Sequence, residues 1–246
     1  MGHDREERQR RMDDLLRLYG SGTGRFSRHS PRLRALRKKL MWNAVIWFSR
    51  AIKRGLDIAG ALVGLTLFSP VMALAALLIL MEDGRPVIFS QIRVGKHGRT
   101  FRMYKFRSMV KNAEELQEGL EADNEAGDVL FKIRRDPRLT RVGAVLRRSS
   151  MDELPQFVNV LLGDMSLVGP RPPTPAEVAR YDYDDRVRLR VAPGITCLWQ
   201  ISGRSRLTFK EQVALDRQYV ESQSFWQDVL ILLRTIPAVL SGKGAY

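Results

Sequence analysis

The stretch Ile58–Met81, IAGALVGLTLFSPVMALAALLILM, runs for twenty-four residues without a charged side chain. About 20 such residues are enough to span a lipid bilayer as a helix. The alternative is a buried helix of a soluble core, but the helices of soluble proteins rarely continue so long without a charged residue. The stretch therefore predicts a membrane helix.

The middle of this helix carries Ser69-Pro70, and both of its flanks are basic. Proline removes a backbone donor and clashes with the preceding turn, so we expect a kink, and the serine hydroxyl can satisfy the carbonyl that is freed. A spanning helix should have basic residues on its cytoplasmic side only. Basic residues in both Arg32–Arg54 and Arg85–Arg107 favour a helix that bends back to the same face, with a kinked span as the alternative.

Positive charge is concentrated at the start of the chain. The net charge of the 246 residues is +14, and residues 1–54 hold fifteen Lys and Arg against five Asp and Glu. Such a segment usually contacts an anionic polymer or an anionic membrane. Because aromatic and aliphatic residues alternate with the cations in residues 31–54, we expect a helix in the membrane interface, bound to anionic lipids. Nucleic acid is not an expected partner, since the excess charge lies next to the membrane helix.

The sequence predicts three parts and an α/β fold that is mainly helical. Residues 1–45 form a basic, partly disordered extension, residues 46–81 an interfacial and re-entrant membrane helix, and residues 82–246 a small cytoplasmic domain with membrane-surface helices. The first residues are charged and polar, unlike a cleavable secretory signal. Cys197 is the only cysteine, which excludes an intramolecular disulfide and fits a reducing compartment.

Several elements are predicted within residues 82–246. A β-hairpin joins Val87–Val94 to Arg99–Phe106 through Gly95–Gly98. Proline makes Gly169–Pro175 irregular. The remaining periodic segments predict helices, at Leu139–Arg148, from near Ser150 to Gly163, from Thr208 to about Ser222, and at Phe225–Leu240.

The chemistry centres on Asp152-Glu153, two adjacent carboxylates that follow two arginines. One interpretation is a helix capping box, Ser150-x-x-Glu153, with Asp152 in the first turn. The other uses the same surroundings to keep Asp152 ionised and to attract a phosphate. Adjacent helical residues point about 100° apart, so one carboxylate could attack while the other holds a metal. The spacing alone favours the capping box over the catalytic interpretation. No zinc-site spacing or Walker loop is present.

Candidate phosphate-binding cations lie elsewhere in the chain. Lys105 and Arg107 stand at a strand end, where alternation puts both on one face. Pro170-Arg171-Pro172 fixes an arginine on a stiff loop, which reduces the entropy lost on binding, and Arg204 follows a Ser-Gly turn. Each of these alone is more often a surface cation. Asp216, on the predicted helix after Thr208, completes the substrate-binding candidates.

Many segments in one order resemble the bacterial monotopic phosphoglycosyl transferases, also called polyprenyl-phosphate hexose-1-phosphate transferases. The resemblance covers about residues 50–246. Its matching segments are Lys53–Asp57, the apolar run with Ser69-Pro70, Tyr104–Met109, Asp136–Gly143, Met151–Gln156, Gly163–Pro172, Pro193–Thr196, Trp199–Arg204 and Gly244–Tyr246.

The resemblance implies a two-step reaction at the cytoplasmic face of the bacterial inner membrane. Asp152 would attack the sugar-linked phosphate of a nucleotide sugar and form a covalent aspartyl phosphosugar, which polyprenyl phosphate then attacks. Glu153 would help Asp152 hold Mg²⁺. Arg147 stands where the family has a functional arginine, and the Pro-Arg-Pro loop and Arg204 are similar to parts of the substrate site. The Ser-Pro break would make the helix re-entrant.

The resemblance also guides the choice of substrate. Its segments Trp199–Arg204 and Gly244–Tyr246 are most similar to relatives that initiate exopolysaccharide, capsule or O-antigen synthesis. We therefore expect a UDP-sugar carrying glucose or galactose and undecaprenyl phosphate as acceptor. Cys197 stands where glycine is usual and Ala192 where a basic residue is common, which leaves the contacts of residues 190–204 open. A monomer and a homodimer both remain open.

Overall fold

The computed structural model describes residues 31–120, 124, 129, 133, 136–203 and 207–241. The chain divides between Phe48 and Ser49 into two compact units, and both of its two-stranded sheets belong to the second. This agrees with the predicted class, mainly helical with a small amount of sheet. The elements are, in chain order, α2 (Pro31–Asp83), β1 (Ile88–Val94), η1 (Lys96–Gly98), β2 (Thr100–Phe106), α3 (Ala113–Glu118), α4 (Arg141–Arg148), η3 (Met151–Glu153), α5 (Gln156–Leu162), β3 (Ser166–Val168), α6 (Pro175–Ala179), η4 (Asp184–Arg190), β4 (Gly194–Thr196), α7 (Leu198–Ser202), α8 (Phe209–Ser222) and α9 (Phe225–Ser241).

Helix α2 contains the predicted membrane segment. By length and composition it is the one helix among the described residues that could cross a membrane, between Leu36 and Asp83. Large apolar side chains along it, such as Leu67 and Leu74, are exposed. An exposed apolar surface of this length suits lipid better than water, which supports the predicted association with a membrane.

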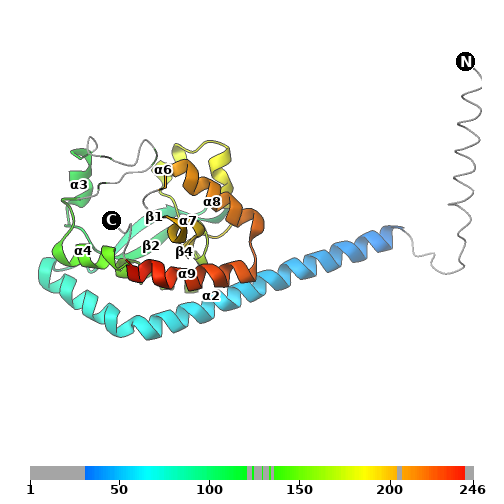
Figure 1. The fold of residues 1–246 in the computed structure, drawn as a ribbon, viewed down its shortest axis with the longest axis horizontal. Coiled ribbons are helices and arrows are strands. Elements are labelled where there is room, and N and C mark those ends of the chain that lie inside the picture. The colour runs from blue at the N-terminus through cyan, green and yellow to red at the C-terminus, as the bar shows by residue number, and fades with distance from the viewer. Residues whose placement is uncertain are drawn as a thin grey trace, which may run out of the picture. The chain divides into compact units, whose positions relative to one another are not determined.

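The helix bends in the cyan part of Figure 1, where the sequence has Ser69-Pro70. Pro70 has no N–H to donate to the carbonyl of Thr66, four residues earlier. The hydroxyl of Ser69 donates to that carbonyl instead, at 2.8 Å. The predicted kink and its compensation by the serine are therefore confirmed.

The first arm of the bent helix, residues 49–69, belongs to the second unit and is fixed to the rest of it by polar contacts. Lys53 forms an ion pair with Asp228 of α9. Arg54 donates to the carbonyls of Val160 and Leu161 at the C-terminal end of α5, at 2.6 and 2.9 Å. A cation there satisfies carbonyls that have no partner within the helix.

The second arm, residues 71–83, is fixed to the same unit at its other end. Glu82 accepts hydrogen bonds from the first two amides of α4, at 2.8 and 2.9 Å. Asp83 forms an ion pair with Arg107, just beyond β2, at 2.8 Å. Ala75 and Ile79 of this arm pack with Phe106 and Leu146 in a small core. Both arms therefore contact one compact unit.

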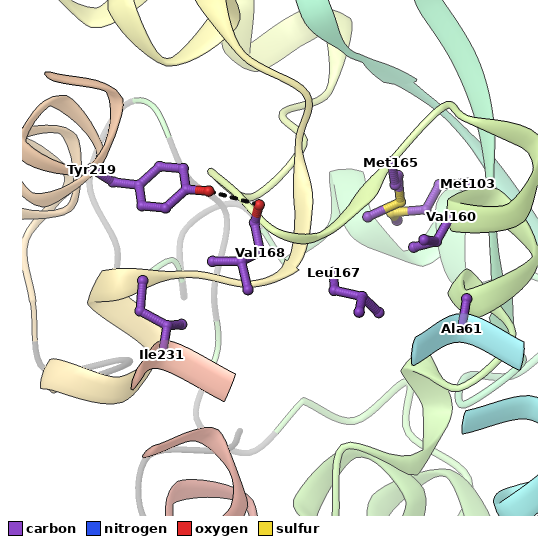
Figure 2. Close-up of a cluster of buried hydrophobic side chains, with 8 residues drawn as sticks. All are labelled: Ala61, Met103, Val160, Met165, Leu167, Val168, Tyr219 and Ile231. Carbon is purple, nitrogen blue, oxygen red and sulfur yellow. Dashed lines mark hydrogen bonds between the residues drawn. The ribbon is translucent and has the colours of Figure 1, made fainter. Parts of the chain in front are cut away.

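The main core gathers side chains from most elements of the second unit. Ala61 of α2, Met103 of β2, Tyr219 of α8 and Ile231 of α9 are all buried in it. Figure 2 shows these residues around Val160, Met165, Leu167 and Val168, with the Tyr219 hydroxyl donating to the Val168 carbonyl at 3.0 Å. The core thus places α5 and β3, which flank the residues of interest, against the first arm of α2.

The hairpin forms as predicted, with Ile88 opposite Phe106 and Val94 opposite Thr100. Helices α8 and α9 begin within two residues of the predicted starts. The helix predicted from Ser150 is interrupted, because Ser150 adopts a left-handed conformation (φ 57°) and Pro155 lacks an amide, so that the short turn η3 precedes α5. The sequence also gave no signal for the parallel pair β3–β4, which joins three residues on each side.

Candidate active site

Asp152 and Glu153 lie on η3, between the C-terminal end of α4 and the start of α5. Ser150 makes no side-chain capping bond. Glu153 instead accepts a hydrogen bond from Lys105 Nζ on β2, at 2.8 Å. The capping-box interpretation is therefore wrong for this turn, and the two carboxylates are available for other contacts.

The carboxyl group of Asp152 is almost completely buried, with 6 % of the residue exposed. Burial raises its pKa to about 6, and the negative charge of Glu153 acts in the same direction, while Lys105 and Arg147 lower it. Removing a charged carboxylate from water is costly unless a partner compensates. Asp152 thus has a carboxylate that is ionised at neutral pH but poorly solvated.

Glu153 behaves differently from its neighbour. Burial would raise its pKa, but the charge and the hydrogen bond of Lys105, followed by Arg171 and Arg147, lower it overall. The arginines of α4 and of the Pro-Arg-Pro loop therefore lie close enough to Glu153 to influence its ionisation. Lys105, Arg147 and Arg171, predicted separately, thus all act on the ionisation of Glu153, and Lys105 contacts it directly.

The Pro-Arg-Pro loop follows β3 and is held on both sides. The Gly194 amide of β4 donates to the carbonyl of Pro170 at 3.0 Å, and the Val94 amide of β1 donates to that of Pro173 at 2.8 Å. Pro170 and Pro172 are buried, whereas the Arg171 side chain is 37 % exposed. The backbone of the loop is fixed while its arginine can meet a ligand, as the sequence predicted for a stiffened loop.

Other predicted candidates lie elsewhere or have structural partners. Arg107 is buried and donates to the carbonyls of Asp83 and Gly84, besides its ion pair with Asp83. Arg107 does not share a phosphate-binding face with Lys105. Strand β2 ends at Phe106, and the Arg107 side chain binds Asp83 and Gly84 at the end of α2. Arg204 lies outside the described residues.

Asp216 is fully buried on α8 and forms an ion pair with Arg188 of η4. Burial raises its pKa to about 6, although Arg188 and Arg171 lower it. The Arg188 guanidinium also donates to the Tyr181 hydroxyl at 3.0 Å. Cys197, the departure from the usual glycine, is buried beside this network, and burial raises the pKa of its thiol. Asp216 thus belongs to a buried network with Arg188 and Tyr181 and has no surface for a ligand.

Two residues near Arg171 were missed by the sequence analysis. Arg93 of β1 is buried below the loop and donates to the carbonyl of Pro172 at 3.0 Å. Glu177 of α6 lies 3.9 Å from Arg171 and 4.0 Å from Arg93, measured between guanidinium nitrogens and carboxylate oxygens. The segment Thr174–Glu177 is a capping box with proline in its first turn, a signal that could have been recognised.

The residues present are compatible with Mg²⁺. The described part of the chain contains no group of three or more His, Cys, Asp or Glu that could hold a metal by themselves. Asp152 and Glu153 supply two carboxylates, which is the number that Mg²⁺ commonly takes when substrate phosphates and water complete its coordination. The donor set fits a metal that binds together with a diphosphate.

Known proteins share this chain's sequence over most of its length. The model of a family described as bacterial sugar transferase matches residues 48–242. The galactosyl transferase CpsE of Streptococcus agalactiae is 50% identical over 194 residues, which cover 78% of this chain and 43% of that protein. The undecaprenyl-phosphate galactose phosphotransferase of Salmonella typhimurium is 43% identical over 80% of this chain and 42% of its own length.

A shorter relative matches nearly end to end. The exopolysaccharide production protein ExoY of Rhizobium meliloti is 42% identical over 198 residues, covering 79% of this chain and 88% of that protein. The chain therefore spans less than half of the two longer relatives and corresponds to most of the shorter one.

Proposed function

Since the chain belongs to the bacterial sugar transferase family, we propose that it transfers a hexose 1-phosphate from a UDP-sugar to undecaprenyl phosphate, and so initiates the assembly of an exopolysaccharide or capsule. The observation that carries this proposal is the buried Asp152 beside Glu153, with Lys105 and Arg147 influencing the ionisation of both carboxylates and Arg171 that of Glu153. Relatives are named for galactosyl transfer and for undecaprenyl phosphate, so galactose is the first sugar to test.

In the first step, a carboxylate oxygen of Asp152 attacks the phosphorus next to the sugar. A bond forms between that oxygen and phosphorus, the diphosphate P–O bond breaks, and UMP leaves with the bonding electrons. Poor solvation makes the carboxylate a better nucleophile, and a carboxyl whose pKa is about 6 remains mostly ionised at pH 7 and above. The product is an aspartyl phosphosugar.

In the second step, a phosphate oxygen of undecaprenyl phosphate attacks the same phosphorus and the Asp152 carboxylate leaves. Arg171 and Arg147 are suited to hold the phosphates, because guanidinium groups bind phosphate through paired donors. Lys105 keeps Glu153 ionised. Mg²⁺ bound by Asp152 and Glu153 would neutralise charge on the diphosphate.

The membrane arrangement in this proposal is re-entrant, with the second unit on the cytoplasmic face of the inner membrane. Both arms of α2 are fixed to one unit, through Lys53 at one end and Asp83 at the other. That geometry supports a helix that enters and leaves by one face, where a lipid phosphate can reach Asp152. The described part of the first unit exposes Leu40, Trp42 and Trp47 among its cations, which suits an anionic lipid surface.

The experiment that tests this function traps the intermediate. Incubation with Mg²⁺ and UDP-galactose labelled in its β-phosphate should leave label on the protein and release UMP before undecaprenyl phosphate is added. Hydroxylamine should release the label, because it cleaves acyl phosphates, and EDTA added first should prevent labelling. A parallel panel of UDP-sugars identifies the sugar.

Asp152→Asn is the decisive variant, since an amide cannot form the acyl phosphate; it should insert normally yet never acquire label. Release of UMP only when both substrates are present would instead indicate direct transfer. Asp152 would then act as a base or metal ligand. No UMP release from any UDP-sugar would reject the function.

A further inference from the structure

Arg93 and Glu177 form a largely buried support beside the Pro-Arg-Pro loop, next to its partly exposed Arg171. Arg93 is 7 % exposed, and its guanidinium donates to the Pro172 carbonyl at 3.0 Å and to the Gln91 side chain at 2.6 Å. Glu177 presents one carboxylate oxygen to Arg93, at 4.0 Å, and the other to Arg171, at 3.9 Å. One carboxylate therefore lies between a buried cation and the partly exposed arginine of the loop, whose charge also acts on Glu153.

The positive charges of Arg93 and Arg171 need a negative partner in this cluster. Burial, followed by the positive charge of Arg171, lowers the pKa of Arg93 to about 10, while Glu177 and Glu153 raise it. Arg93 stays protonated at neutral pH, so the two guanidinium groups repel one another. Glu177 is the nearest anion to both, and like charges in a poorly solvated region are costly without such a partner.

The Glu177 side chain also contacts the backbone where the loop leads into α6. Its carboxylate accepts a hydrogen bond from the Thr174 amide at 2.9 Å, and its own amide donates to the Thr174 hydroxyl at 3.1 Å. This capping box fixes the start of α6 immediately after the loop. The same side chain thus joins the loop backbone to the arginine that the loop carries.

We propose that Glu177 is a positioning residue: with Arg93, it holds the Arg171 side chain in the orientation that binds the diphosphate of the nucleotide sugar. The proposal rests on the proposed function, in which Arg171 binds phosphate. Glu177 itself does not contact the substrate; it acts by compensating the repulsion between the two guanidinium groups and by tethering one of them.

Glu177→Gln separates this role from helix capping. Glutamine also serves in a capping box, so the hydrogen bond to the Thr174 amide can persist while the charge disappears. The chain offers a matched control in Glu211, which forms the same box with Thr208 at the start of α8 and, among the residues that the structure describes, forms no ion pair with an arginine. Glu211→Gln removes the same charge from the same motif.

The measurement is the Kd for UDP in the presence of Mg²⁺, by calorimetry on the full chain in detergent. Glu177→Gln should weaken binding about tenfold, equivalent to about 1.4 kcal/mol, and Glu211→Gln should bind as the wild type does. In an Arg171→Gln background, Glu177→Gln should add no further loss, because its effect passes through Arg171.

Wild-type affinity for UDP in Glu177→Gln, or losses of affinity that simply add in the double variant, would overturn the positioning role. The proposed function would still stand if the wild type releases UMP. If the wild type neither binds UDP nor releases UMP, the proposed function fails and this inference fails with it.

Discussion

Neighbouring carboxylates acquire opposite acid–base behaviour because only one of them meets a cation directly. Glu153 receives the Lys105 ammonium at 2.8 Å, and its pKa falls below its usual range. Asp152 is more deeply buried, no hydrogen bond joins it to Lys105, and its pKa rises to about 6. Lys105 lowers the pKa of both carboxylates, but it pairs directly only with Glu153, and for Asp152 burial outweighs it.

A stability measurement can detect the cost of burying Asp152. Its pKa rises from an ordinary 3.8 to about 6, so ionisation disfavours the folded state. The penalty is absent below pH 3.8, grows between the two values and is complete above about pH 6. Asp152→Asn should therefore stabilise the protein at pH 7.5, by on the order of 3 kcal/mol, and by about half as much at pH 5.

Thermal unfolding in detergent, without Mg²⁺ or nucleotide, checks this expectation through tryptophan fluorescence. Asp164→Asn is a control, since Asp164 is a carboxylate of the same second unit in the turn after α5. If Asp152→Asn were less stable than the wild type at pH 7.5, the expectation that ionised Asp152 destabilises the folded state would be wrong.

At the scale of the elements, contacts on both sides of the apolar stretch of α2 determine where its two arms lie. Asp57 is buried and accepts hydrogen bonds from the Ser166 hydroxyl and the Leu167 amide of β3, each at 2.9 Å. Strand β3 leads directly into the Pro-Arg-Pro loop. The first arm of the membrane helix is therefore attached to the strand that carries Arg171.

Arg107 belongs to the other end of α2, and its replacement should reveal a structural role. Arg107→Gln removes an ion pair and hydrogen bonds made to Asp83 and Gly84. We expect a loss of about 2–3 kcal/mol in the free energy of unfolding with an unchanged KM for the UDP-sugar. Lys105→Gln should have the opposite profile, a slower release of UMP with little loss of stability, since Lys105 is partly exposed.

Denaturant unfolding and initial-rate kinetics on the two variants test the contrast. A raised KM for the UDP-sugar in Arg107→Gln without a loss of stability would contradict the structural role. It would support the substrate-binding role that strand alternation predicted.

The sequence predicted the elements whose signals are local, and missed those created by distant contacts. The hairpin, α8, α9 and the break at Ser69-Pro70 each follow from turn residues, periodicity or proline within a short window. The partners of Lys53 and Asp57 are more than a hundred residues away in the sequence, and no local sequence pattern predicts these contacts. For the same reason Arg107 was misjudged, because its partner lies on a helix end that folds back.

The candidate site shows the same division. Asp152, Glu153 and Arg171 were recognised because they stand in dense motifs, and the structure brings them close to Lys105 and Arg147. Arg93 was missed because an arginine on a predicted strand normally faces solvent, and the structure buries it. Arg93 is buried by α6 and the Pro-Arg-Pro loop, which pack onto β1 only in the folded chain.

At the scale of the second unit, its exposed apolar side chains and its bent helix determine how it can meet a membrane. Besides α2, helix α9 exposes Phe225, Trp226, Leu230, Leu233 and Ile236. Figure 1 shows α9 beside α2, and Lys53 and Asp228 join the two helices. A surface with apolar side chains on two adjacent helices favours a unit that lies on the membrane with α2 inserted.

The topology of α2 gives the last prediction. Crossing about 30 Å of hydrocarbon would put the two ends of the apolar stretch in different compartments. The ends, however, are joined to one unit by Lys53–Asp228 and by Asp83–Arg107, and a span would break one of these pairs. We therefore expect cysteines at the exposed positions Arg50 and Arg85, in a Cys197→Ala background, to react with an impermeant maleimide in inverted vesicles and not in intact spheroplasts.

Pro70→Ala extends the test, because it restores the missing N–H and relieves the clash that bends the helix. A straighter helix reaches further across the bilayer, so a fraction of the position-50 cysteines should become reactive from the outside, while position 85 stays protected with the second unit. The ion pairs of the two arms oppose this straightening. The fraction of position-50 cysteines labelled from the outside therefore measures how far the proline, rather than the ion pairs, maintains the bend. Labelling of positions 50 and 85 from opposite sides in the chain that retains Pro70 would establish a span. The contacts that fix both arms to one unit would then have to open in the membrane.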